Sequence, residues 1–98
     1  MSQIPTPPQE AVTANAEGMA AIRAGDATTA IAAFTRATQA DPGALALWRN
    51  LAHAYRLAGD DKLEGTALDR ALSIDRLDFG TQLRKAQLLQ RQNQEQAA

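Results

Sequence analysis

The sequence contains no cysteine, so a disulfide framework, a thiol nucleophile and a zinc–thiolate site are all excluded. It has no long apolar run, so we expect no segment that spans a membrane. The first ten residues have neither a basic start nor an apolar stretch, unlike a secretory signal. We therefore expect a cytoplasmic location.

Neither sign of charge is in excess, since 10 Lys and Arg residues stand against 11 Asp and Glu residues. A general nucleic-acid binder usually has a strong basic excess, so we expect no nucleic-acid partner. Aromatic residues make up 4% of the chain, valine occurs once and isoleucine four times. A chain that is poor in these residues and rich in alanine and leucine favours helices, which predicts an all-α fold.

The 98 residues are enough for one small domain, which buries roughly 64% of its unfolded surface. Three prolines within residues 5–8 predict a flexible N-terminal segment, 1–8, ahead of a domain at 9–98. Apolar residues at helical spacing then predict five helices, separated by Gly25-Asp26, Asp41-Pro42-Gly43, Gly59-Asp60 and Asp75-Arg76. We expect residues 93–98, at the end of the fifth helix, to fray.

The turns and the helix positions repeat with an offset of 34 residues. One coincidence at this offset would mean little, but four pairs in matching structural roles predict a repeat of helical hairpins. The pairs are Gly25-Asp26 with Gly59-Asp60, Phe34 with Leu68, Ala37 with Ala71, and Asp41 with Asp75.

The period and these residues resemble the tetratricopeptide repeat. Trp48-x-x-Leu51-Ala52-x-x-Tyr55 is similar to the family's first helix, and Ala30-x-x-x-Phe34-x-x-Ala37 is similar to its second. The resemblance covers residues 11–98 and implies an α-solenoid with repeats at 11–44 and 45–78 and a partial third repeat at 79–98. Small residues at Gly18, Ala52 and Ala86 are expected where the two helices of a hairpin approach closely.

The sequence departs from this pattern in several places. Glu64 stands at the usually small position that matches Ala30, and Arg76 stands where Pro42 would repeat. Ala98 aligns with Ala30, so the frame stops where a sixth helix should begin. We expect either a fragment of a longer protein or a small protein with a single capping helix.

Nothing in the sequence predicts catalysis. His53 is the only histidine, and there is no glycine-rich phosphate loop and no Gly-x-Ser-x-Gly turn. Asp60 and Asp61 are better explained as a helix cap and a first-turn charge than as an acid–base pair. We therefore expect a protein that is not an enzyme and that needs no cofactor or metal.

The resemblance implies a concave groove that binds an extended or helical segment of a partner. On that geometry the expected groove residues carry few acidic groups, because these concentrate in the turns and second helices. Arginine offers bidentate contacts to carboxylates, so the expected partner is an acidic protein or peptide. Alternatively, these arginines are solvated or pair with neighbouring acids. The groove residues are Asn15, Met19, Arg23, Arg49, Asn50, His53, Arg56, Arg84, Gln87 and Arg91.

Some tetratricopeptide repeats hold the carboxylate tail of heat-shock chaperones with five Lys, Asn and Arg residues. Asn50 and Arg84 match that set, whereas Asn15, Met19 and Gly80 do not. We therefore do not expect a chaperone tail as the partner.

Two further functions stay open. The stretch Trp48–Leu72 resembles the helical leader of bacterial aspartyl/asparaginyl β-hydroxylase-like dioxygenases, which implies a role in positioning or subunit assembly. The last helix also leaves an apolar edge, which predicts a homodimer. The residues of this edge are Phe79, Leu83, Leu88 and Leu89.

Overall fold

The computed structural model describes residues 7–97, and within them every regular element is an α-helix. The expected flexible segment 1–8 lies outside the described residues except for Pro7 and Pro8, which precede the first helix. The prediction of an all-α fold is confirmed. The helices are α1 (Gln9–Arg23), α2 (Ala27–Ala40), α3 (Leu45–Ala58), α4 (Asp61–Ile74) and α5 (Phe79–Ala97).

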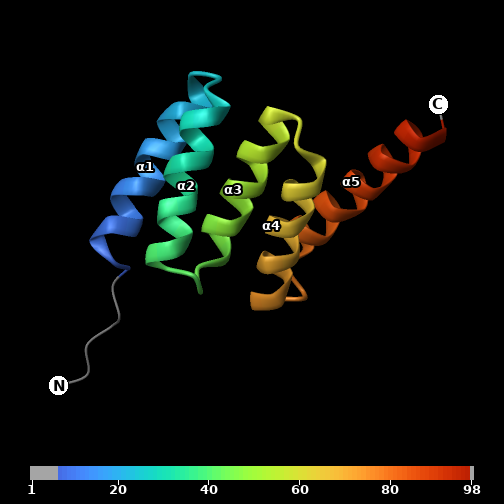
Figure 1. Cartoon of the computed structure of the whole chain (residues 1–98). Coiled ribbons are helices and arrows are strands. Elements are labelled where there is room, and N and C mark those ends of the chain that lie inside the picture. The colour runs from blue at the N-terminus through green and yellow to red at the C-terminus, as the bar shows by residue number, and fades with distance from the viewer. Residues whose placement is uncertain (1–6, 98) are drawn as a thin grey trace.

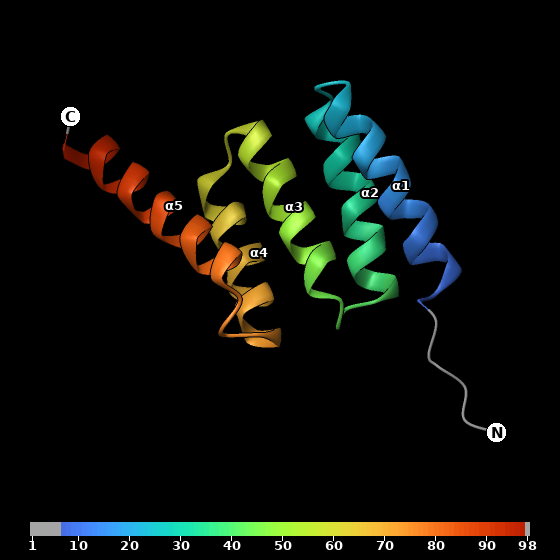
Figure 2. The ribbon, with the colours of Figure 1, turned by 180° about the vertical axis from the view of Figure 1, so that it is seen from behind.

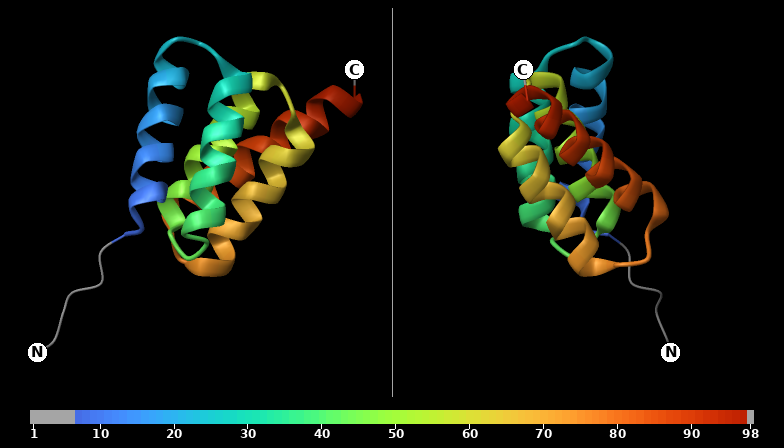
Figure 3. Two further views of the ribbon diagram at one scale, coloured as in Figure 1. Left: turned by 60° about the vertical axis from the view of Figure 1, so that its left-hand side comes forward. Right: turned by 90° about the vertical axis from the view of Figure 1, so that its right-hand side faces the viewer.

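The helices form a short stack of hairpins (Figures 1 and 2). α1 pairs with α2 and α3 pairs with α4, while α2 and α3 join the two hairpins. α5 packs against α4 and leaves the stack at an angle, so that its C-terminal half extends away from the other helices (Figures 1 and 3). The chain is therefore an α-solenoid of helical hairpins, as predicted.

The two Gly-Asp turns fold alike. Gly25 and Gly59 have φ values of 71° and 78°, in the left-handed region that only glycine enters at little cost. The aspartate that follows each glycine caps the next helix. Asp26 Oδ1 accepts a hydrogen bond from the Thr29 N–H at 3.1 Å, and Asp60 Oδ1 accepts one from the Leu63 N–H at 3.0 Å. These short turns make each pair of helices antiparallel.

Within the hairpins, small residues bring the helices close together. A Cβ atom at Gly18 would lie 2.4 Å from the Phe34 ring, so only glycine fits against this fully buried side chain. Ala52 is likewise buried. Ala86, which was expected to serve the same purpose, is exposed because α5 has no second helix beside it within the described residues.

The core centres on Phe34, Leu51 and Leu68, which come from α2, α3 and α4. Trp48 and Tyr55 pack against this core but are only partly buried. The Trp48 indole N–H donates to the Pro42 carbonyl at 2.8 Å, which ties the start of α3 to the preceding turn. The centre of the fold is therefore built from aliphatic residues and one phenylalanine.

α5 corrects two expectations. Leu88 is 1% exposed and packs on Gly65 of α4, so it belongs to the core and not to the exposed edge where we had placed it. The helix also continues through Ala97, so residues 93–97 are helical where we expected fraying; Ala98 lies outside the described residues. Thr81 is the other buried residue of α5.

Candidate functional site

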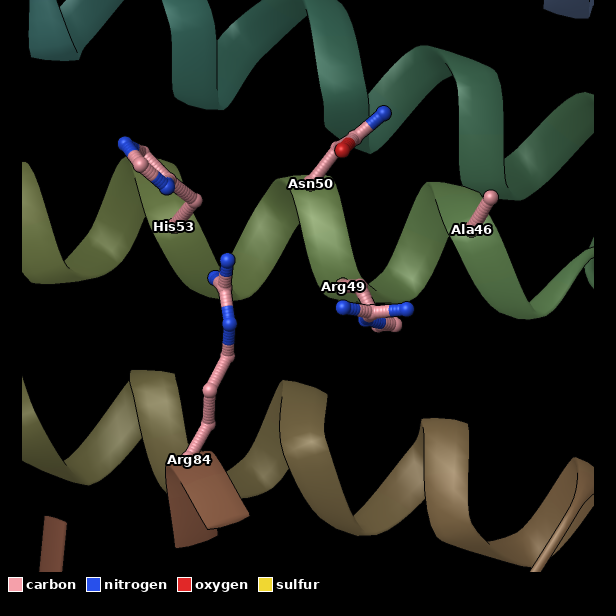
Figure 4. A pocket seen from close by; sticks show the side chains of 5 residues that line it. All are labelled: Ala46, Arg49, Asn50, His53 and Arg84. Atoms are coloured by element: carbon pink, nitrogen blue, oxygen red, sulfur yellow. The ribbon is translucent and has the colours of Figure 1, made fainter. Parts of the chain in front are cut away.

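A basic cavity of about 240 Å³ lies between α3 and α5. α3 contributes residues at successive turns of one helical face, because positions three, four and seven apart share a face. From α5, Arg84 reaches toward the side chains of α3 (Figure 4). No carboxylate is among the residues that line the cavity, which are Ala46, Arg49, Asn50, His53 and Arg84.

Asn50 is held in place from the neighbouring hairpin. Its amide nitrogen donates to the Asn15 side-chain oxygen of α1 at 2.9 Å, across 35 residues of sequence. The bond links the first helices of the two hairpins and leaves the Asn50 side-chain oxygen free to accept a hydrogen bond. One wall of the cavity is thereby fixed by the repeat architecture itself.

Arg49 occupies the floor beside the start of α5. Its Nη1 lies 3.6 Å from Asp78 Oδ2, and a Cβ atom at Gly80 would lie only 2.9 Å from its Nη2. Gly80 therefore admits the guanidinium against the first turn of α5. The Arg49 Nε atom is buried and makes no hydrogen bond with any described residue, which leaves one donor unsatisfied.

Asp78 joins the end of the cavity to the cap of α5. Its carboxylate accepts a bond from the Thr81 side-chain hydroxyl and another from the Thr81 N–H at 3.1 Å. The Thr81 hydroxyl holds the pKa of Asp78 below its ordinary value, and the charge on Arg49 acts in the same direction. Asp78 is therefore a charged N-cap that also orients Arg49.

His53 lies among cations. Its pKa is lowered, first by partial burial and then by the charges of Arg84 and Arg56, while Glu64 opposes the shift. His53 is consequently neutral at pH 7, and one ring nitrogen can accept while the other donates. The cavity therefore offers the cation Arg84, the partly paired Arg49, an amide and a neutral imidazole.

A family model described as tetratricopeptide repeat matches residues 21–62, which include all of α2 and α3. This segment is a tetratricopeptide repeat. No curated protein sequence matches the chain. Tetratricopeptide repeats generally mediate protein–protein interactions and are typically non-catalytic.

The cavity lies on the helix face where the tetratricopeptide pattern predicted a groove, and four of the ten predicted groove residues line it. Arg56 lines a neighbouring hollow of about 330 Å³ with His53 and Leu57. Asn15 lines a third hollow, of about 200 Å³, between α1 and α3. Met19, Arg23 and Gln87 are exposed and line none of these three hollows.

Arg91 differs most from its predicted place. Its Nη2 lies 2.7 Å from Glu64 Oε1 and 3.0 Å from Asp61 Oδ1, both on α4. Its charge is thus paired within the fold and is not offered to a ligand in the groove. The alternative that some of these arginines pair with neighbouring acids therefore holds for Arg91 and, at the longer distance of 3.6 Å, for Arg49.

Sequence reasoning missed two residues of the site. Ala46 lines both the basic cavity and the hollow beside α1, and its place three residues before Arg49 could have indicated this. Asp78 was recognised only as a cap. Its contact with Arg49 depends on how α5 docks, which carries no local sequence signal.

Two other kinds of site find no support in the part of the chain that the structure describes. Residues 7–97 contain no group of three His, Cys, Asp or Glu side chains that could hold a metal ion. No described helix is both long and apolar enough to cross a membrane.

Proposed function

We propose that this chain is a protein-interaction module that binds an acidic segment of a partner in the cavity between α3 and α5. The observation that carries the proposal is the convergence of Arg49, His53 and Arg84 on one cavity that no carboxylate lines. A ligand carboxylate would accept from Arg84 in a bidentate contact, which planar guanidinium groups favour.

Two further features support an anionic ligand. The buried Nε of Arg49 lacks an acceptor among the described residues, and an oxygen atom entering the cavity would supply one. The mutual repulsion of Arg84, Arg56 and a protonated His53 lowers the pKa of His53, and a bound carboxylate would offset that repulsion. Both features make the cavity more favourable when it is occupied by a negative charge.

The test uses a fluorescein-labelled hexaglutamate peptide with a free carboxyl terminus, and follows its binding to the 98-residue chain by fluorescence anisotropy. Arg84→Gln should weaken binding by about tenfold to a hundredfold, because a hydrogen bond to a charged group contributes about 1.5–3 kcal/mol. Arg84 is the residue to change because the described structure shows no ion pair for it, so its loss should leave the fold intact.

Arg76→Gln is the matched control. It removes the same charge from the exposed turn between α4 and α5, outside the cavity. If both variants weaken binding equally, the peptide responds to net charge and the cavity is not the site. If a hexalysine peptide binds as well as hexaglutamate, the proposed charge preference is wrong.

A further inference from the structure

The face of α5 that points away from α4 has an unusual composition for an exposed helix. With a rotation of 100° per residue, six residues fall into one line, at alternating spacings of four and three. All six are exposed, and Phe79 and Leu83 are 74% and 46% exposed. The line consists of Phe79, Leu83, Ala86, Gln90, Asn93 and Ala97; we call it the outer face of α5.

No charged residue lies on this outer face. Lys85 pairs with Asp69 of α4 at 3.0 Å, Arg91 pairs with Asp61 and Glu64, and Arg84 faces the cavity. The fourth charged residue, Glu95, is seven positions after the buried Leu88 and so lies on the same side of the helix. Every charge of α5 is therefore directed to the side that packs on the rest of the fold.

The residues that border the outer face are uncharged as well. Gln82 and Leu89 lie along one side, and Gln87 and Gln94 lie along the other. Glutamine and asparagine side chains both donate and accept hydrogen bonds, so the same amide-rich surface satisfies itself across a symmetry axis. A surface without charge also brings no like charges together when it meets its own copy.

The repeating interval of three and four residues is the interval at which two helices pack along their length. We propose that two copies of this chain associate through the outer face of α5, with Phe79 and Leu83 at the centre of the contact. Leu77 and Ile74, both exposed beside Phe79 at the start of α5, extend the apolar part of the contact.

The occupant is a second copy because the chemistry of the face matches itself better than it matches a charged partner. A charged side chain placed against the outer face would be taken from water with no opposite charge to receive it. An identical face brings apolar residues and neutral amides only. Since the contact spans about 27 Å of helix, which is under three heptads, we expect a weak dimer with a dissociation constant in the micromolar range.

This association leaves the groove available. Arg84 is about 140° around α5 from Phe79, so the cavity and the outer face lie on opposite sides of the helix. In the right-hand view of Figure 3, α5 crosses the end of the stack, which places its outer face beyond the last hairpin. A dimer would therefore carry two open cavities and could bind a partner with two acidic segments more tightly than one copy does.

The test is the molar mass in solution, measured by sedimentation equilibrium from about 5 to about 500 µM, a range that brackets weak interfaces. We expect the apparent mass to rise with concentration from 10.5 kDa toward twice that value. Leu83→Glu should weaken the dimer at least tenfold, because it places two like charges across the axis. A mass that stays at 10.5 kDa throughout overturns the proposal.

Leu57→Glu is the matched control, since Leu57 of α3 is also 46% exposed but lies far from the outer face. We expect it to change the dissociation constant less than twofold. Equal weakening by both variants would contradict the proposed interface. Gln90→Glu, a polar replacement on the same face, should also weaken the dimer, and it tests the interface independently if Leu83→Glu fails to fold by circular dichroism.

Discussion

The contact between Arg91 and Glu64 gives the sharpest stability prediction. Glu64 has a side chain that is only 5% exposed, and Arg91 Nη2 lies 2.7 Å from its Oε1 atom. The position that corresponds to Glu64 in the first hairpin is Ala30, which is fully buried. α4 therefore buries a carboxylate where the repeat normally buries a methyl group, and α5 supplies the charge that neutralises it.

We expect Arg91→Ala to lower the free energy of unfolding by about 2–3 kcal/mol. Removing one partner of a buried ion pair typically costs about 3–5 kcal/mol, because the remaining charge is left uncompensated. Arg91 is 32% exposed, so water reaches the pair and reduces this figure. Glu64→Ala should cost about 1 kcal/mol or less, since it restores the alanine of the first hairpin and leaves Arg91 paired with Asp61.

The assay is urea unfolding followed by far-UV circular dichroism, with a thermal melt beside it. For a chain of this size, about 2 kcal/mol corresponds to a fall in Tm of roughly 8–16 °C. The double variant Glu64→Ala/Arg91→Ala should be more stable than Arg91→Ala alone, because it no longer buries an unpaired carboxylate. Arg76→Ala, at an exposed position, should change stability by no more than about 0.5 kcal/mol.

Two results would refute this reasoning. Arg91→Ala might prove as stable as the Arg76→Ala control, in which case Glu64 is solvated once α5 loosens. The double variant could instead show the simple sum of the two single effects, which would mean that the two side chains do not interact. Either result would remove the ion pair as a reason for the docking of α5.

Gly18→Ala should lower stability by about 1–3 kcal/mol, because its Cβ would lie 2.4 Å from the buried Phe34 ring. Gly43→Ala is its control in the same urea titration: a Cβ there meets nothing within 4 Å, so a change beyond about 0.5 kcal/mol would contradict the packing argument. Because the pKa of His53 is lowered on folding, its neutral form contributes stability above pH 6.5 that is lost as the pH falls from 6.5 through the depressed pKa. In an NMR titration Arg84→Gln should raise that pKa, since it removes a neighbouring charge, and an unchanged or lower pKa would contradict the assigned cause.

The hairpins could be predicted from the sequence because their signals are local. A glycine that must adopt positive φ and an aspartate that caps the next helix stand side by side in both turns, 34 residues apart. Each of these residues fixes its turn through bonds to its own neighbours. Repetition then placed the two turns in equivalent positions, which identified the repeat without any tertiary information.

The docking of α5 could not be predicted in the same way. This helix has one apolar line through Phe79 and Leu83 and another residue, Leu88, on the opposite side. Hydrophobic periodicity shows that a helix has an apolar face, but it cannot choose between two faces that differ by half a turn. The choice is made by the ion pairs of Lys85 and Arg91 with α4, which join residues far apart in the sequence.

The candidate site was predictable to the extent that it lies on one helix. Arg49, Asn50 and His53 share a face of α3 by spacing alone, and the structure places all three around the same cavity. Arg91 was assigned to the groove by its position on α5, but the buried Glu64 holds it elsewhere. A charged residue follows its nearest buried counter-charge, and that partner depends on tertiary packing.

The attachment of α5 to a single neighbour has a consequence for the groove. In a linear array each element is held only by the elements beside it, so the last helix opens at a lower free energy than the hairpins do. Amide hydrogens of α5 should therefore exchange faster than those of α2 and α3. Arg84 leaves the cavity whenever α5 undocks, so the observed affinity for an acidic segment equals the intrinsic affinity multiplied by the fraction of molecules in which α5 is docked.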